Sequence, residues 1–143
     1  MTSEGHWHSA VVYQVYWRSL KDVKGDGIWD LKGLRSKIGS LSSLGVDAIW
    51  LNPTYPSPQG DHGYDVSNYF DVDPLFGTLE ELEQAIDEFH DHGMAVLLDI
   101  VPNHVSSQHP WFISAKEGGH GHEAESRFII RQGKGDSGGI PPN

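Results

Sequence analysis

Three short apolar runs are the feature that most restricts how this chain folds. They are VVYQVY at residues 11–16, VDAIWL at 46–51 and MAVLLDI at 94–100. Each run is largely continuous and does not alternate apolar with polar residues, which is typical of strands covered on both faces of a parallel sheet. The three runs therefore predict three strands of such a sheet.

Two segments with helical periodicity separate the runs. The first has Asp30 as its expected N-cap and Gly45 at its end, and its apolar positions are Leu31, Leu34, Ile38, Leu41 and Leu44. The second begins with a capping box formed by Thr78 and Glu81 and ends at Gly93, and its apolar positions are Leu79, Leu82, Ile86 and Phe89. The order β-α-β-α-β predicts an α/β fold with right-handed crossovers.

Two stretches lie outside this β-α alternation. Residues 52–77 form a loop much longer than usual, and it leaves the carboxyl end of the second predicted strand, where α/β proteins bind ligands. After residue 104 the chain is rich in Gly, His, Ser and Pro, and its one strand candidate is FII at 128–130. Because three strands and two helices leave an open edge and an incomplete core, we expect the first part of a larger domain.

The composition excludes several classes of function. With 20 acidic and 10 basic residues, the net charge of −10 argues against binding to nucleic acid or to an anionic membrane surface. The absence of cysteine excludes disulfides, thiolate catalysis and Cys-ligated zinc. The first residues lack the basic and apolar regions of a signal peptide, and no apolar run approaches the ~20 residues of a membrane span. We therefore expect a cytoplasmic protein.

The segment LLDIVPNH at 97–104 ends the third predicted strand in polar groups. Asp99 interrupts the apolar run, Pro102 ends it, and Asn103 and His104 follow side by side. A carboxylate at the end of a parallel strand is suited to hold a cation, an arginine or a substrate hydroxyl. Alternatively, Asp99 and Asn103 only tie down the turn, and His104 is a loop histidine without a functional role.

The segment GDHGYDV at 60–66 lies in the long loop. Asp61 and Asp65 together with Tyr64 combine two carboxylates with an aromatic ring, which suits a sugar. Carboxylates accept hydrogen bonds from neighbouring hydroxyls, and the ring covers the apolar C–H face of a pyranose. The alternative is an Asp-Gly-type turn followed by a structural tyrosine. Because adjacent parallel strands bring their carboxyl ends together, we expect this segment to lie close to Asp99.

The segment KDVKGDGIWD at 21–30 is similar to the start of an EF-hand-type calcium loop. The expected ligands are the side chains of Asp22, Asp26 and Asp30 and the carbonyl of Ile28. The twelfth position is Gly33 and not Glu, and Lys24 stands where Asp or Asn is usual. In the alternative interpretation, the ammonium group of Lys24 lies among the carboxylates and replaces the metal.

Six segments, in chain order, resemble glycoside hydrolase family 13, the α-amylase family, and most closely its α-glucosidase and oligo-1,6-glucosidase branch. They are AVVYQVYWRSLKD, GDGIWDLKGL, LGVDAIWLNPTYPSP, DHGYDVSNYFDVDPLFGTLEEL, LLDIVPNHVSSQHPWF and FIIRQG…GGIPPN. The resemblance implies an α/β fold that is the N-terminal part of a (β/α)8 TIM barrel. Residues 1–104 would supply its first three βα units, with strands 1–3. Residues 105–143 would begin domain B, which this family inserts after the third strand.

The resemblance also implies roles for single residues. Asp61 looks like the acid that hydrogen-bonds the non-reducing-end glucose, Tyr64 like its stacking platform, and His104 like a donor to the sugar's 6-hydroxyl. Asp99 would order the arginine beside the nucleophile, and Asn103 would hold the loop. The family's metal loop usually has Asn where this chain has Lys24, although the three acids remain. Ca²⁺ is therefore the one cofactor that the resemblance implies.

No catalytic carboxylate is expected within these residues. A retaining glycosidase needs a nucleophile and an acid/base carboxyl ~5–5.5 Å apart, and in this family they follow the fourth and fifth strands. The resemblance thus implies an N-terminal fragment, inactive alone, of a retaining α-glucosidase that hydrolyses terminal α-linked glucose from maltose or short oligosaccharides. The alternatives are a sucrose- or trehalose-forming transglucosidase or isomerase of the same family and a non-catalytic, amylase-like scaffold.

Overall fold

The computed structural model describes residues 6–17, 30–119, 121 and 123–130, and it contains a three-stranded parallel sheet. The strands, in spatial order, are β1 (Val12–Val15), β2 (Ala48–Leu51) and β3 (Ala95–Leu98). Val15 of β1 pairs with Leu51 of β2, which pairs with Leu98 of β3. The three predicted strands and their parallel arrangement are confirmed. Because the register is level, the three carboxyl ends lie at one edge of the sheet.

The segment between β1 and β2 forms two short helices, α1 (Leu31–Arg35) and α2 (Ile38–Leu44). The prediction of one continuous helix is therefore wrong at Ser36 and Lys37. The Ser36 hydroxyl donates to the carbonyl of Gly33 (2.6 Å), and the Lys37 N–H donates to the carbonyl of Leu34, three residues back (2.9 Å). Both bonds tighten the turn, so the regular α-helical ladder is interrupted there.

The predicted ends of this helical region are confirmed. Asp30 caps α1, because its Oδ1 accepts from the N–H of Gly33 (2.7 Å). Gly45 ends α2 at φ 83°, a left-handed backbone conformation in which glycine is strongly favoured.

Helix α3 (Leu79–Asp91) lies between β2 and β3 and starts with the predicted capping box. Thr78 Oγ1 accepts from the N–H of Glu81 (3.2 Å), and the Glu81 carboxylate accepts from the N–H of Thr78 (3.1 Å). Arg35 of α1 donates to Glu88 of α3 through Nε (2.8 Å) and through a second guanidinium nitrogen. This two-point ion pair joins α1 to α3 at the surface.

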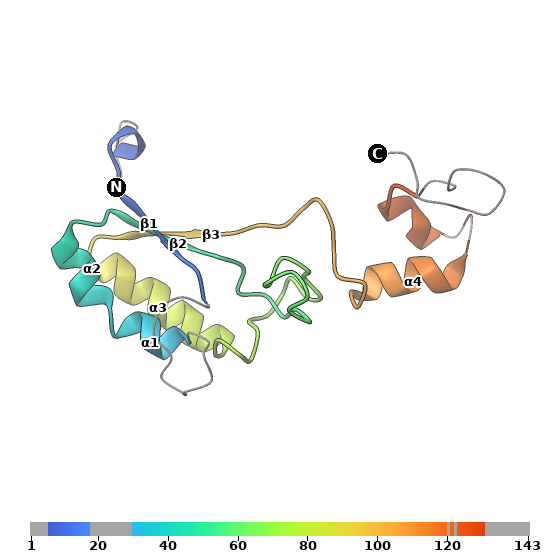
Figure 1. Cartoon of the computed structure of the whole chain (residues 1–143), viewed down its shortest axis with the longest axis horizontal. Coiled ribbons are helices and arrows are strands. Elements are labelled where there is room, and N and C mark those ends of the chain that lie inside the picture. The colour runs from blue at the N-terminus through green and yellow to red at the C-terminus, as the bar shows by residue number, and fades with distance from the viewer. Residues whose placement is uncertain (1–5, 18–29, 120, 122, 131–143) are drawn as a thin grey trace.

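Helices α1, α2 and α3 cover only one face of the sheet (Figure 1). The core lies between that face and the helices, and its largest members are Val15, Leu31, Leu34, Ile49, Leu51, Phe89 and Met94. On the opposite face, Val12 and Leu97 are 43% and 36% exposed, and none of the described helices packs there. A sheet with one open apolar face is the arrangement expected for the first strands of a barrel, whose interior the later strands would fill.

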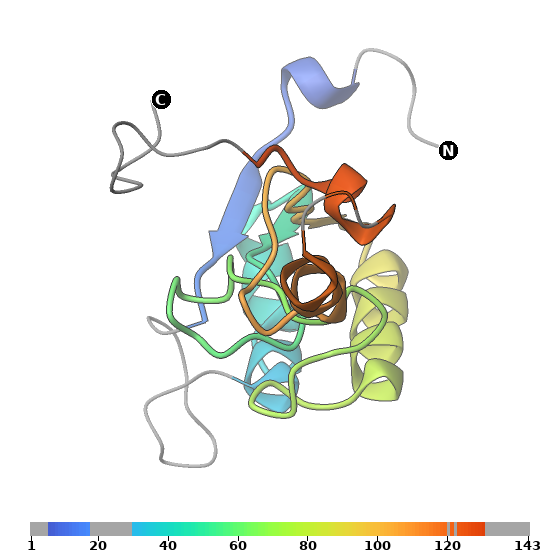
Figure 2. The same ribbon diagram turned by 90° about the vertical axis from the view of Figure 1, so that its right-hand side faces the viewer.

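Two further helices follow the sheet, α4 (Pro110–Gly118) and the 3-10 helix η2 (Glu123–Arg127), and a 3-10 helix η1 (His6–His8) precedes it. The α4–η2 pair lies beyond the carboxyl end of β3, away from α1 to α3 (Figures 1 and 2). The strand predicted at 128–130 is wrong, because Phe128 packs edge-on against Phe112 of α4 (5.6 Å) and the following residues form no ladder. None of the helices in the described part of the chain is long and apolar enough to cross a membrane.

Helix α4 was not predicted from the sequence. Its N-cap is His109, whose Nδ1 accepts from the N–H of Trp111 (3.1 Å), and Pro110 occupies its first position. The proline was a usable start signal, but histidine is not among the usual capping residues. Burial lowers the pKa of His109, which keeps the ring neutral and able to accept this bond.

Two glycines of α2 provide a matched test of the backbone argument. A Cβ atom at either Gly39 or Gly45 would meet nothing within 4 Å, but only Gly45 has a positive φ, of 83°. We expect Gly45→Ala to lower the free energy of unfolding by about 1–2 kcal/mol because of its left-handed backbone. Gly39→Ala, in the first turn of α2 and without a positive φ, should raise it by up to about 0.5–1 kcal/mol. Urea unfolding checks both values, and equal effects of the two substitutions would contradict the argument.

Candidate functional site

The candidate site lies at the carboxyl-end edge of the sheet. Residues 52–77 form no helix or strand, as predicted, and they lie beside the ends of β2 and β3 (Figure 1). Asn52 and Asp99 directly follow the paired residues Leu51 and Leu98. The long loop and the two strand ends are therefore neighbours, as the level register requires.

Tyr64 and Asp99 form the central contact of this site. The Tyr64 hydroxyl donates to Asp99 Oδ2 (2.7 Å), and the indole N–H of Trp50 donates to Oδ1 (3.1 Å). The Tyr55 hydroxyl also donates to the main-chain carbonyl of Asp99 (3.1 Å). Both carboxylate oxygens are engaged, so the orientation of Asp99 is determined by two aromatic side chains.

The surroundings of Tyr64 keep its hydroxyl protonated. Burial, the hydrogen bond to Asp99 and the charges of Asp99 and Asp61 raise the pKa of Tyr64 to about 12. At any pH near neutrality the phenol thus remains a hydrogen-bond donor. The Tyr64 N–H also donates to the Asp61 carbonyl (2.9 Å), so the structure brings Asp61, Tyr64 and Asp99 together, as expected from their positions in the sequence.

Two hydrogen-bonding residues behind Tyr64 were missed in the sequence. Asn52 donates from Nδ2 to the Tyr64 hydroxyl (3.0 Å), and Gln14 donates from Nε2 to Asn52 Oδ1 (2.9 Å). The sequence contained an indication of both residues. Gln14, Trp50 and Leu97 are paired across the three strands, so side chains at positions 14, 50, 52, 97 and 99 lie on the same face of the sheet. Polar side chains at alternate positions of a largely apolar strand were a usable sign of a network.

His104 lies against the main chain of Tyr64. Its Nε2 is 3.0 Å from the Tyr64 carbonyl, and its Nδ1 is 3.3 Å from Asn103 Nδ2. The one hydrogen of the Tyr69 hydroxyl is shared between the carbonyls of Val101 (2.5 Å) and His104 (3.1 Å), which holds this turn. His104 and Asn103 are exposed, and both ring nitrogens are already engaged. A sugar hydroxyl would have to replace one of these bonds.

Asp61 is exposed at the tip of a turn that another acid closes. The carboxylate of Asp65 accepts from the Ser57 hydroxyl (2.6 Å) and from the N–H groups of Gly60 (2.9 Å) and Asp61 (3.1 Å). Burial would raise the pKa of Asp65, but these hydrogen bonds lower it below its ordinary value of 3.8. The carboxylate of Asp65 therefore stabilises the loop, whereas the carboxylate of Asp61 is exposed to solvent.

The backbone around Asp61 is strained on both sides. Gln59 and His62 have φ values of 63° and 53°, in the left-handed region that residues other than glycine rarely adopt. Such conformations persist when the surrounding contacts determine them, and they gather at ligand sites. Here the Asp65 carboxylate holds the N–H groups of Gly60 and Asp61, the two residues between Gln59 and His62.

Most of the predicted calcium site lies outside the described residues, namely Asp22, Lys24, Asp26 and Ile28. Asp30 is described, and it is only 2% exposed. Its Oδ1 caps α1, while its Oδ2 has no hydrogen-bond partner in the described part of the chain. A buried carboxylate oxygen without a partner fits the role of a cation ligand.

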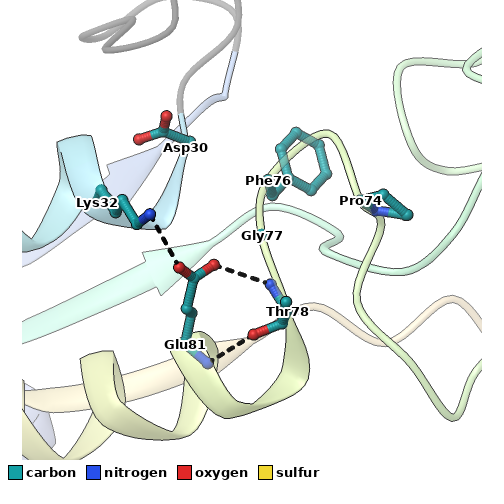
Figure 3. A pocket seen from close by; sticks show the side chains of 7 residues that line it. All are labelled: Asp30, Lys32, Pro74, Phe76, Gly77, Thr78 and Glu81. Atoms are coloured by element: carbon teal, nitrogen blue, oxygen red, sulfur yellow. Dashed lines mark hydrogen bonds and ion pairs between the residues drawn. The ribbon is translucent and has the colours of Figure 1, made fainter.

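The described surroundings of Asp30 offer no complete metal site. Figure 3 shows the hollow beside it, where Lys32 reaches Glu81 (3.4 Å) and Glu81 bonds to Thr78. No cluster of three or more His, Asp or Glu side chains that could hold a metal occurs in the described ranges. Further ligands would have to come from the 22–28 segment.

The fold and the site together define the first part of a (β/α)8-barrel protein with its ligand site at the carboxyl ends of the strands. The family model described as "Alpha amylase, catalytic domain" matches residues 14–143. The chain belongs to the α-amylase family, glycoside hydrolase family 13, as the sequence segments predicted.

Three similar proteins illustrate the family. The probable α-glucosidase of Rhizobium meliloti (strain 1021) is 45% identical over 137 residues, 96% of this chain and 24% of that protein. The oligo-1,6-glucosidase of Heyndrickxia coagulans is 46% identical over 111 residues, 78% of this chain and 20% of that protein. The crystal structure of the trehalulose synthase MutB from Pseudomonas mesoacidophila MX-45 has a TM-score of 0.86 at 45% identity, covering 91% of this chain and 23% of that one.

These coverages show how much of the relatives' length the chain represents. The chain spans between a fifth and a quarter of the length of the curated relatives just described. The expected fold class, the N-terminal part of a (β/α)8 barrel with its first three strands, is confirmed.

Removing the charge of Asp65 should loosen the turn that carries Asp61. In Asp65→Asn, one carboxamide oxygen replaces a carboxylate that accepts three hydrogen bonds. We expect the KM for an α-glucoside to rise about tenfold in the full-length protein, the effect of losing one charge-assisted bond. Asp71→Asn is the matched control, because Asp71 is exposed and its Oδ1 only accepts from the next N–H (2.8 Å).

The Asp65→Asn substitution should also change how the free energy of unfolding depends on pH under acidic conditions. Because the pKa of Asp65 is lowered on folding, its contribution is complete above about pH 4 and is lost as the pH falls through the lowered value. Between about pH 4 and the lowered pKa of Asp65, the free energy of unfolding of Asp65→Asn should fall less steeply with falling pH than that of the wild type. Urea unfolding as a function of pH measures this, and parallel curves would contradict it.

Proposed function

We propose that the whole protein is a retaining α-glucosidase that removes terminal α-linked glucose from maltose or short oligosaccharides, and that this chain forms one wall of its glucose site. The observation that carries the proposal is the Tyr64–Asp99 hydrogen bond of 2.7 Å at the ends of β2 and β3, with His104 against the same tyrosine. Relatives named as α-glucosidase and oligo-1,6-glucosidase support it.

Three residues contact the glucose in this proposal, and a fourth orients one of them. The exposed carboxylate of Asp61 accepts hydrogen bonds from hydroxyls of the non-reducing-end glucose. The ring of Tyr64 covers the apolar C–H face of that glucose, and its high pKa keeps it uncharged while it does so. His104 donates to the 6-hydroxyl by exchanging one of its two present bonds. Asn103, whose amide meets Nδ1 of His104 (3.3 Å), orients that ring.

Asp99 acts behind the sugar and not on it. Its oxygens already accept from Tyr64 and Trp50, and a carboxylate has about four lone-pair sites in total. The remaining sites are available to an arginine beside the nucleophile. The nucleophile and the acid/base are proposed to lie outside these 143 residues, because in this family they follow the fourth and fifth strands and the described sheet has three.

Residues 105–143 are proposed to begin domain B. In the described part of this segment, α4 packs against η2, and Phe112 of α4 meets Phe128, the residue that follows η2. They contribute none of the residues of the core cluster between the sheet and α1 to α3. A segment with its own contacts that leaves the sheet after β3 is consistent with the start of an insertion. The expectation that residues 1–104 end the barrel part of the chain remains a prediction.

A second candidate function is a transglucosidase or isomerase that acts on sucrose or forms trehalose. The observation that favours it is the similarity to a trehalulose synthase, with a TM-score of 0.86. The same glucose site would serve both reactions, and the acceptor side would decide between them. A non-catalytic scaffold is less favoured, because Asp61, Tyr64, Asp99 and His104 are all present. The cytoplasmic location stays a prediction.

We also propose that the 22–30 loop holds a Ca²⁺ ion through Asp22, Asp26, Asp30 and the carbonyl of Ile28. The partnerless Oδ2 of Asp30 supports it. The ion would stabilise the loop that leads into α1, and it would take no part in the reaction.

The proposed activity predicts release of glucose from the chain end. The full-length protein should hydrolyse maltose and a chromogenic α-glucoside, with α-glucose as the first product by NMR, because two displacements retain configuration. Asp61→Asn should lower kcat/KM at least tenfold, while Asp71→Asn should leave it unchanged. The chain 1–143 alone should be inactive.

Product analysis on sucrose separates the two candidate functions. Glucose and fructose as the main products would support the hydrolase, whereas an isomeric disaccharide would favour the isomerase. Cleavage of internal bonds in a long oligosaccharide would contradict both. Absence of any reaction with an α-glucoside would favour the scaffold.

The proposed metal predicts a calcium-dependent stability. Addition of Ca²⁺ after chelation should raise the melting temperature of the full-length protein, by an amount that depends on the ratio of concentration to Kd. Terbium bound in the loop should be excited through Trp29, the residue that precedes Asp30 in the sequence. Asp26→Asn should weaken both effects, and Asp71→Asn should not. If chelation has no effect and terbium does not bind, Lys24 replaces the metal.

A further inference from the structure

We propose that Asn52 is a positioning residue that holds the Tyr64 ring, and the hydrogen of its hydroxyl, in the orientation that the glucose site requires. The inference deepens the proposed function and rests on it, because Tyr64 is the proposed platform for the sugar. Asn52 itself touches no sugar in this proposal. It acts through its hydrogen bond to the Tyr64 hydroxyl.

The direction of these hydrogen bonds follows from the chemistry of the groups around Asp99, where the series of bonds ends. An indole N–H only donates, and a carboxylate oxygen only accepts. A phenol has a single hydrogen, and Tyr64 gives it to Asp99 Oδ2 (2.7 Å). Its oxygen must therefore accept from the third neighbour, and Asn52 Nδ2 is that donor (3.0 Å).

The same reasoning fixes which way the Asn52 amide faces. With its NH₂ group toward Tyr64, its Oδ1 points to β1 and accepts from Gln14 Nε2 (2.9 Å). The chain of bonds thus runs in one direction, from Gln14 through Asn52 and Tyr64 to Asp99. No group in it can be reversed without placing two donors or two acceptors against each other.

The main chain of Asn52 is held as firmly as its side chain. Its N–H donates to the carbonyl of Val15 (3.2 Å), and its carbonyl accepts from Trp17 Nε1 (3.0 Å). The residue is 6% exposed, and Trp17 stacks on Phe76 (4.7 Å). A buried residue with four bonds to its surroundings is a fixed point from which Tyr64 is oriented.

Tyr64 needs such a point because its own segment has no regular structure. The loop that carries it contains neither helix nor strand, and the ring is partly exposed. The bond to Asp99 holds one position of the hydroxyl, and a single bond allows the ring to pivot about it. The Asn52 bond reaches the same oxygen from the end of β2, and two bonds from the ends of different strands restrict the orientation of the ring.

A double-mutant cycle between positions 52 and 64 tests the inference in the full-length enzyme. Asn52→Leu is similar in size but leaves the Tyr64 hydroxyl without a donor. We expect it to raise the KM for a chromogenic α-glucoside about tenfold with less than a threefold change in kcat, as for loss of uniform binding. In Tyr64→Phe enzyme, where the hydroxyl is absent, the same substitution should change KM less than twofold.

Two further variants make the cycle decisive. Asn68→Leu makes the same replacement in the same loop, where the amide only accepts from the N–H of Phe70 (2.9 Å), and it should leave KM unchanged. If Asn52→Leu does not fold, Asn52→Asp keeps the size and the acceptor for Gln14. It places an acceptor opposite the Tyr64 oxygen, and the same rise in KM is expected.

Each outcome supports or overturns a named statement. Equal effects of Asn52→Leu in both backgrounds, or parallel losses of kcat and melting temperature without a change in KM, would overturn the positioning role and leave the proposed function intact. A wild-type enzyme that is inactive on every α-glucoside would overturn the proposed function and the role of Asn52 with it. A KM effect confined to the enzyme with Tyr64 supports the inference.

Discussion

The hydrogen bond between Tyr64 and Asp99 is the interaction on which the candidate site depends. It joins a 26-residue loop (52–77) to the end of β3 across 35 residues of sequence. Trp50 and Asn52 of the intervening β2 segment complete its surroundings from either side. Without this contact, the Tyr64 side chain would make no hydrogen bond to the end of β3. Because burial and two nearby carboxylates raise the pKa of Tyr64 to about 12, the bond keeps its direction at any pH near neutrality.

The parallel register of the sheet makes that contact possible. Each strand ends level with its neighbour, so residues that follow β2 and β3 meet at one edge. Helices α1 to α3 cover one face of this sheet, the apolar face that carries Val15, Ile49 and Leu51 (Figure 1). The face that bears Gln14, Trp50 and Leu97 stays open in the described part of the chain. For a member of the α-amylase family that face is the interior of a barrel, and the residues that fill it lie in the remaining part of the domain.

The errors of the sequence-based predictions share a physical cause. Strands, helix caps and the glycine that ends α2 were correct, since each depends on residues within a few positions of one another. The break at Ser36 was missed because a serine can lie within a continuous helix or interrupt it. Which of the two occurs depends on whether its hydroxyl donates to a main-chain carbonyl, as it does here to Gly33. The strand expected at 128–130 was wrong because Phe128 had an aromatic partner in an unexpected helix. Asp65 was considered with Asp61 as a pair of carboxylates suited to a sugar, and the structure shows its carboxylate closing the turn that presents Asp61.

The sequence by itself determined the order of strands and helices, the location of the long loop with Asp61 and Tyr64, and the polar segment with Asp99 and His104 after the third strand. Periodicity and capping are local, so they can be read along the chain. Only the tertiary structure decided which donor meets which acceptor, as between Gln14 and Asn52 across 38 positions. Those pairings depend on register and on the path of a loop without regular structure, and neither leaves a local pattern. This is why LLDIVPNH predicted a polar strand end, while its bond to Tyr64 and the support from Asn52 emerged only from the fold.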